Sequence, residues 1–132
     1  MRIQPTAKSS KVTLAAVLAA TLPLAGCGGN KAGGASDLTF SEISPDIFTV
    51  VIDPKADVPK TEAAMRKHCD ARSSCTVYGW TDATATARTV PLDDAHYASL
   101  AVRYVAHAVG TDDMMWDCLR FPTAKAPCLP KA

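Results

Sequence analysis

The segment DIFTVVID, residues 46–53, decides how this chain is expected to fold. It is rich in β-branched and aromatic residues and is bounded by Pro45 and Pro54, a pattern typical of a β-strand. The segment SCTVYGWT, residues 74–81, has the same character and predicts a second strand. Because side chains alternate along a strand, one face of it should carry Cys75, Val77 and Gly79 and the other Thr76, Tyr78 and Trp80.

Between these two strands, the segment PKTEAAMRKHCD, residues 59–70, predicts a helix that ends near Cys69. A proline and Glu62 lie in its first turn and three basic residues in its last turn, which is the charge order that suits a helix dipole. A strand, a helix and a strand in this order favour parallel pairing with a right-handed crossover.

The flanking segments give weaker signals. Residues 38–40 predict a short edge strand, and ATATARTVP, residues 83–91, is either a loop or a weak third strand. Asp93 or Asp94 should cap the longest helix, which is expected to run to about Val109 and to be ended by Gly110. Its buried stripe would consist of Tyr97, Leu100, Ala101, Tyr104, Val105 and Ala108.

A short helical turn is expected after this helix. Residues 111–113 would cap it, and it would hold Met114, Met115, Trp116 and Leu119. These elements predict a small two-layer α+β domain over residues 37–132, with a sheet of two to four strands packed against about two helices.

The N-terminal segment has the order of a secretory signal peptide. Three basic residues and no acidic residue come before an apolar run over residues 12–26. This run is too short for a membrane-spanning helix, which needs about 20 residues. The run ends in Leu24-Ala25-Gly26-Cys27, which resembles the lipobox of bacterial lipoproteins.

This resemblance implies removal of residues 1–26 and acylation of Cys27, which anchors the mature chain to a membrane by its lipid. The Gly-rich residues 27–36 would form a flexible tether. Gly28 replaces the aspartate that commonly marks retention at the inner membrane, so the outer membrane, facing the periplasm, is the expected location.

Assigning Cys27 to lipid leaves an even set of cysteines for an oxidising compartment: Cys69, Cys75, Cys118 and Cys128. Four cysteines allow three pairings, of which we favour Cys69–Cys75 and Cys118–Cys128 because each closes a short loop, while the crossed pairing stays open. The spacings match no standard zinc knuckle, so no metal and no cofactor are expected.

The motif C-x5-C-x-V-x-x-W-x-D over residues 69–82 and the motif W-x-C-x-x-F-P over residues 116–122 resemble a loose group of small exported bacterial proteins. That resemblance supports a single domain and implies no activity.

No catalytic constellation emerges from the sequence. His68 is interpreted as a helix-end residue, His96 and His107 would lie eleven residues apart on one helix, and Ser99 has no nucleophile elbow around it. The 14 basic and 13 acidic residues of the whole chain give no indication of nucleic-acid binding. We therefore expect a protein that is not an enzyme.

Tyr78 and Trp80 are the candidate binding face, if no other segment packs over them. The sequence thus predicts a protein-interaction or accessory subunit of a cell-envelope assembly, with a protein partner that it does not identify. A periplasmic inhibitor or immunity-type lipoprotein is the alternative, and an envelope hydrolase is a weaker third reading.

Overall fold

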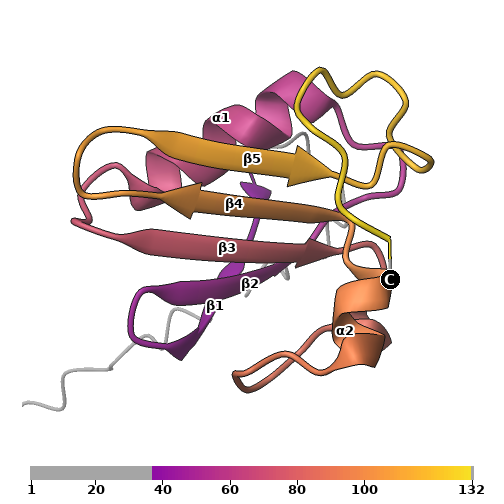
Figure 1. Ribbon diagram of the computed structural model, residues 1–132, viewed down its shortest axis with the longest axis horizontal. Coiled ribbons are helices and arrows are strands. Elements are labelled where there is room, and N and C mark those ends of the chain that lie inside the picture. Colours follow the sequence, from indigo (N-terminus) through magenta and orange to yellow (C-terminus); the bar gives the residue numbers. More distant parts are fainter. Residues whose placement is uncertain (1–36, 132) are drawn as a thin grey trace, which may run out of the picture.

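The computed structural model describes residues 37–131, which form one five-stranded mixed sheet with helices on both faces (Figure 1). The predicted signal peptide, Cys27 and the tether lie outside the described residues. Within those residues, none of the helices combines the length and the apolar character needed to cross a membrane.

The strands follow one another across the sheet in chain order, β1-β2-β3-β4-β5. Their bounds are β1 Phe40–Ser44, β2 Ile47–Val51, β3 Cys75–Trp80, β4 Val102–Ala106 and β5 Asp112–Trp116. Only β2 and β3 pair in parallel, and the other three neighbouring pairs are antiparallel. The α+β class and the parallel strand–helix–strand unit are therefore confirmed, whereas the expected two to four strands were too few.

The helix α1, Val58–Cys69, makes the crossover between the two parallel strands. Asp57 caps it by accepting a hydrogen bond from the Lys60 main-chain N–H at 2.9 Å, and proline occupies the first turn, where no N–H partner is needed. The buried positions of the helix recur every three or four residues and face the sheet: Val58, Thr61, Met65 and Cys69.

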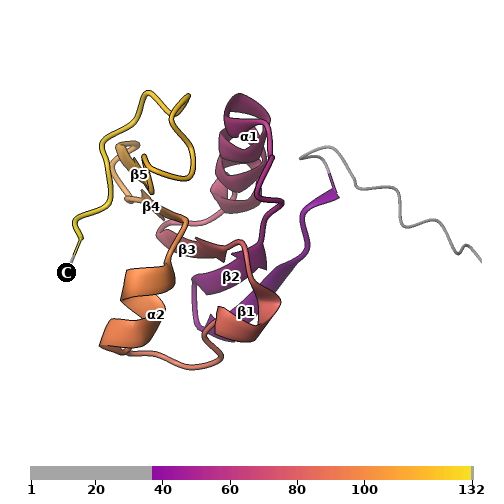
Figure 2. The same ribbon diagram turned by 90° about the vertical axis from the view of Figure 1, so that its right-hand side faces the viewer.

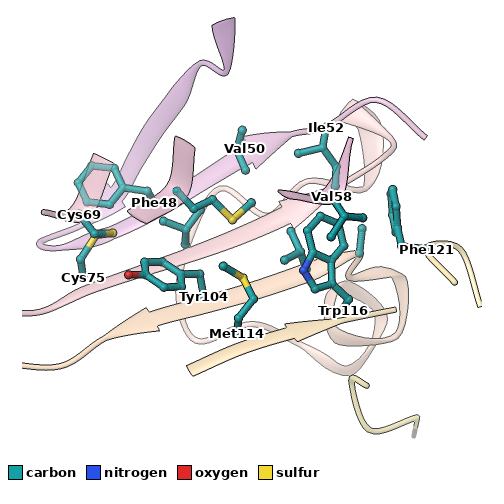
Figure 3. Close-up of a cluster of buried hydrophobic side chains, with 14 residues drawn as sticks. Phe48, Val50, Ile52, Val58, Cys69, Cys75, Tyr104, Met114, Trp116 and Phe121 are labelled. Carbon is teal, nitrogen blue, oxygen red and sulfur yellow. A yellow bond between two sulfur atoms is a disulfide. The ribbon is translucent and has the colours of Figure 1, made fainter. Parts of the chain in front are cut away.

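The main core lies between α1 and the sheet (Figure 3). The Cys69–Cys75 disulfide closes one end of it, and Trp116 packs against Phe121 near the other, with 4.8 Å between ring centroids. The strands contribute side chains from alternate positions, including Phe48, Val50, Val77, Val102, Tyr104 and Met114. The second disulfide joins Cys118 to Cys128, so the favoured pairing is the one that the structure contains.

The long helix expected from Asp93 or Asp94 to about Val109 was wrong. Asp93 does cap a helix, but α2 spans only Asp94–Ser99, and β4 follows it directly. Residues 102–106 read VRYVA, in which Val102 and Tyr104 lie on the core face of the strand and Arg103 and Val105 on the other. The segment pairs with a strand on each side. Pairing on both sides outweighs the helical spacing that part of this segment also shows.

The expected helical turn after residue 110 was also wrong, because Met114 and Trp116 lie in β5. Asp112 and Asp113 cap no helix: Asp112 pairs with Arg66 at 2.8 Å and Asp113 with His107 at 3.0 Å. Gly110 does adopt a left-handed conformation, with φ of 77°, but in the β4–β5 hairpin rather than at a helix end.

The structure also defines the two segments that gave weaker sequence signals, residues 38–40 and 83–91. The expected edge strand at residues 38–40 is displaced towards the C-terminus, since β1 begins at Phe40. Residues 83–91 form a loop that contains only a short 3-10 turn, η2 at Ala83–Ala85. This loop and α2 lie on the face of the sheet opposite α1 (Figure 2), so the sheet is partly covered on a face that the two-layer prediction left open.

Candidate functional site

The partly covered face of the sheet has a small core of its own beside α2. Trp80, Ala87, Leu92 and Leu100 are its buried members. Trp80 is fully buried and donates its indole Nε1–H to the main-chain oxygen of His96 at 3.1 Å. Trp80 packs under α2 and the 81–93 loop and therefore cannot serve as an exposed binding anchor. The expected binding face of Tyr78 and Trp80 was wrong for Trp80.

Tyr78 lies on the same face but is only partly buried, and α2 places Tyr97 against it. The two rings meet edge to face, with 6.4 Å between centroids and 87° between planes. Tyr97 is 50% exposed, so it is the accessible member of the pair. Burial raises the pKa of the Tyr78 phenol, the neighbouring Tyr97 adds to the rise and Arg103 opposes it, so the phenol stays neutral at physiological pH.

Arg103 lies beside this pair in the middle of β4. The sheet register places it opposite Tyr78 on one side and opposite Met115 on the other. Its Nε is buried and has no hydrogen-bond partner. Within residues 37–131 Arg103 joins no ion pair, whereas Arg66, Arg72 and Arg120 each pair with an aspartate, at 2.8, 3.2 and 3.2 Å.

Two adjoining hollows run between α2 and the C-terminal segment, and we call them together the α2 groove. The larger holds about 320 Å³ and the smaller about 70 Å³. Arg103 lines the smaller hollow, while Leu119, Arg120 and Lys131 line the larger one. Both hollows share Tyr97, Ala98, Leu100, Leu129 and Pro130.

The outer wall of the α2 groove is the C-terminal segment, which descends from β5 towards α2 (Figures 1 and 2). Main-chain hydrogen bonds hold this segment beside β5: Trp116 N–H donates to the Pro127 oxygen at 3.0 Å, and Leu129 N–H donates to the Trp116 oxygen at 2.7 Å. The Cys118–Cys128 disulfide closes the loop between them. The wall is thus positioned by one covalent link and a short stretch of backbone pairing.

The histidines considered in the sequence are not brought together. His96 contacts Asp93 at 2.6 Å and His107 contacts Asp113 at 3.0 Å, both at the surface. The two histidines do not share a helix as expected, since His107 follows β4. Ser99, the last residue of α2, donates its hydroxyl to the main-chain oxygens of Ala95 and His96 at 3.0 and 3.1 Å, as a helix-end serine does.

His68 lies at the end of α1, where it stacks on Phe40 with 4.0 Å between ring centroids. Its Nε2 is buried without a hydrogen-bond partner. Burial lowers the pKa of His68 and the charge of Arg72 lowers it further, while Glu42 opposes the shift. Across residues 37–131 no three His, Cys, Asp or Glu side chains gather as a possible metal site.

Sequence reasoning found Tyr78 but missed Tyr97 as an exposed residue and missed Arg103 altogether. Both errors have one origin, the assignment of residues 93–109 to a single helix, which placed Tyr97 in a buried stripe. Assignment of residues 102–106 to a strand would have placed Arg103 on the face opposite to Val102 and Tyr104. That is the face that Arg103 shares with Tyr78.

Comparisons of this chain with protein-family models, with curated proteins and with solved structures found no match.

Proposed function

We propose that this chain is a lipid-anchored bacterial envelope protein that is not an enzyme and that binds a protein partner through the α2 groove. The membrane address rests on the lipobox at residues 24–27. The two disulfides of the domain suit an oxidising compartment outside the cytoplasm, which supports the same address.

The observation that carries the binding role is the exposure of large apolar side chains around the groove. In the described part of the chain the exposed large hydrophobic residues are Val51, Tyr97, Val109 and Leu119, and two of them, Tyr97 and Leu119, line the groove. Leu119 is 77% exposed, and an aromatic and an aliphatic anchor beside a hollow are typical of protein-binding surfaces.

Photo-crosslinking in cells tests this proposal. A benzophenone amino acid at position 97 of the full-length chain should give a discrete light-dependent adduct with an envelope protein, and Leu119→Ser should abolish that adduct. Val109 supplies the matched control, because it is 83% exposed but lies outside the residues that line the groove. Equal adducts at positions 97 and 109, or none at position 97, would contradict the proposal.

Mass spectrometry of the adduct separates the accessory role from the alternative. A structural subunit of an envelope assembly in the adduct supports the proposed role. A toxic or lytic enzyme would instead assign this chain to the inhibitor class.

A further inference from the structure

Arg103 is a cation that the domain leaves without a counter-charge. A partly buried guanidinium loses hydration, and a buried donor without an acceptor is costly unless some group bonds to it. Among the exposed arginines of residues 37–131, Arg66, Arg72 and Arg120 pair with aspartates and Arg88 joins no ion pair, so Arg103 is the partly buried arginine that lacks a carboxylate partner there. Arg103 also lines the smaller hollow, where a group from outside the domain can reach its guanidinium.

The side chains around Arg103 determine which chemical group fits there. We propose that the α2 groove selects an acidic segment of its protein partner, in which one carboxylate bonds to Arg103 and a neighbouring apolar side chain packs against Tyr97 and Leu119. The inference rests on the proposed function for the kind of partner and adds the residue type that the groove recognises.

A carboxylate matches Arg103 because a guanidinium presents its N–H groups as a planar fork that two carboxylate oxygens can accept together. Tyr78, opposite Arg103 in the register, stays protonated and so puts no negative charge beside the guanidinium. Of the charged residues around the larger hollow, Arg120 pairs with Asp117, and Lys131 adds to the positive charge of Arg103.

The two hollows give room for two neighbouring side chains of one segment. The smaller hollow, of about 70 Å³, is lined by Arg103 and accommodates a carboxylate beside it. The larger hollow, at about 320 Å³, is roomy enough for an apolar side chain of the same segment.

Selection from a random peptide library tests this specificity directly. The probe is a phage-displayed dodecapeptide library, panned against the detergent-purified full-length chain. Selected peptides should carry Asp or Glu next to a large apolar residue. Replacing that Asp or Glu by its amide should weaken binding of the synthetic peptide by about tenfold or more, the usual loss for a charge-assisted hydrogen bond.

Variants of the chain then assign the carboxylate to Arg103. Arg103→Gln should weaken binding of the acidic peptide by about the same factor and leave binding of the amide peptide unchanged, because only the acidic peptide bonds to the guanidinium. Arg103→Lys should recover part of the loss, since it keeps the charge but not the fork. Arg88→Gln is the matched control, because Arg88 is exposed in the 81–93 loop and lines neither hollow. Circular dichroism should show all three variants folded.

Three results would overturn the proposal: no enrichment, enrichment of peptides without acidic residues, or acidic peptides that bind Arg103→Gln as well as the parent chain. Competition by phosphatidylglycerol vesicles for the same groove would also overturn it, because the anionic occupant would then be lipid. If peptide selection gives the expected acidic peptides but crosslinking in cells fails, the proposed envelope role is contradicted and the specificity of the groove is still supported. Failure of the proposed function and failure of this inference are therefore distinguishable.

Discussion

The indole Nε1–H of Trp80 donates a hydrogen bond to the main-chain oxygen of His96, 3.1 Å away. This contact ties α2 to the end of β3. The residue that follows His96 is Tyr97, which the same attachment holds against Tyr78 and over the α2 groove. A fully buried residue thus positions the exposed aromatic that we propose as a binding anchor.

Trp80→Phe should separate these two roles. Loss of the hydrogen bond and of part of the buried volume should lower the free energy of unfolding by about 1–3 kcal/mol, measured by urea denaturation. Tyr97→Ala, at a half-exposed site, should cost less, about 0.5–1.5 kcal/mol through loss of the edge-to-face contact with Tyr78, yet remove the main anchor of the groove for its partner. If Tyr97→Ala destabilised the chain as much as Trp80→Phe, Tyr97 would be a structural residue instead.

Gly79 should tolerate no side chain, because the Val102 side chain of the neighbouring strand β4 fills the space where a Cβ would lie. A Cβ at this position would lie 2.5 Å from Val102 Cγ1 and 3.7 Å from Met65 Cε. Gly79→Ala should therefore cost about 1–3 kcal/mol of stability. Gly110→Asn is the control: nothing lies within 4 Å of a Cβ there, and asparagine accepts the left-handed backbone better than other residues with a side chain. Equal losses would show that the close approach of Val102 does not restrict position 79.

Stability should fall in weak acid because of His68. Its pKa in the folded chain is lowered from 6.5, so the unfolded chain binds the proton first and is stabilised relative to the folded chain as the pH drops below about 6.5. His68→Phe should keep the stack on Phe40 and remove this fall. Thermal unfolding between pH 7.5 and pH 5 measures it. The same acid-side loss in parent and variant would assign the effect to other groups.

The disulfide Cys118–Cys128 should be reduced before Cys69–Cys75. Cys128 is exposed, whereas Cys69 and Cys75 are 1% and 2% exposed. Mild dithiothreitol followed by alkylation and peptide mass analysis should label Cys118 and Cys128 first. Replacing both by serine should cost about 2–3 kcal/mol through the freed loop. It should also speed exchange of the Leu129 amide proton, and protection unchanged from the parent would contradict the role of this link in holding the groove wall.

The parts of the fold that sequence could predict are those with strong local signals. Proline in the first turn and a basic last turn indicate α1 from the sequence, and two β-branched segments on either side of it lead to a parallel pair. The even set of four cysteines gave both disulfides, because the favoured pairing joins residues close in sequence.

What escaped prediction depends on contacts distant in sequence. Leu100, Ala101 and Tyr104 satisfy a helical spacing, and Val102 and Tyr104 satisfy the alternation of a strand. Only pairing with β3 and β5 decides between the two patterns. Tyr97 in α2 and Arg103 in β4 line the same groove. The sequence could not indicate this as long as both residues were assigned to one helix.

Lipid on Cys27 is the premise on which the proposed membrane location and the proposed envelope partner depend. Intact-mass spectrometry of the chain extracted from cell membranes measures it. We predict a species that begins at Cys27 and carries a diacylglyceryl group, with Cys27→Ser abolishing the adduct and releasing the chain from the membrane. A soluble species with an unmodified Cys27 thiol, or with residues 1–26 still attached, would contradict this account.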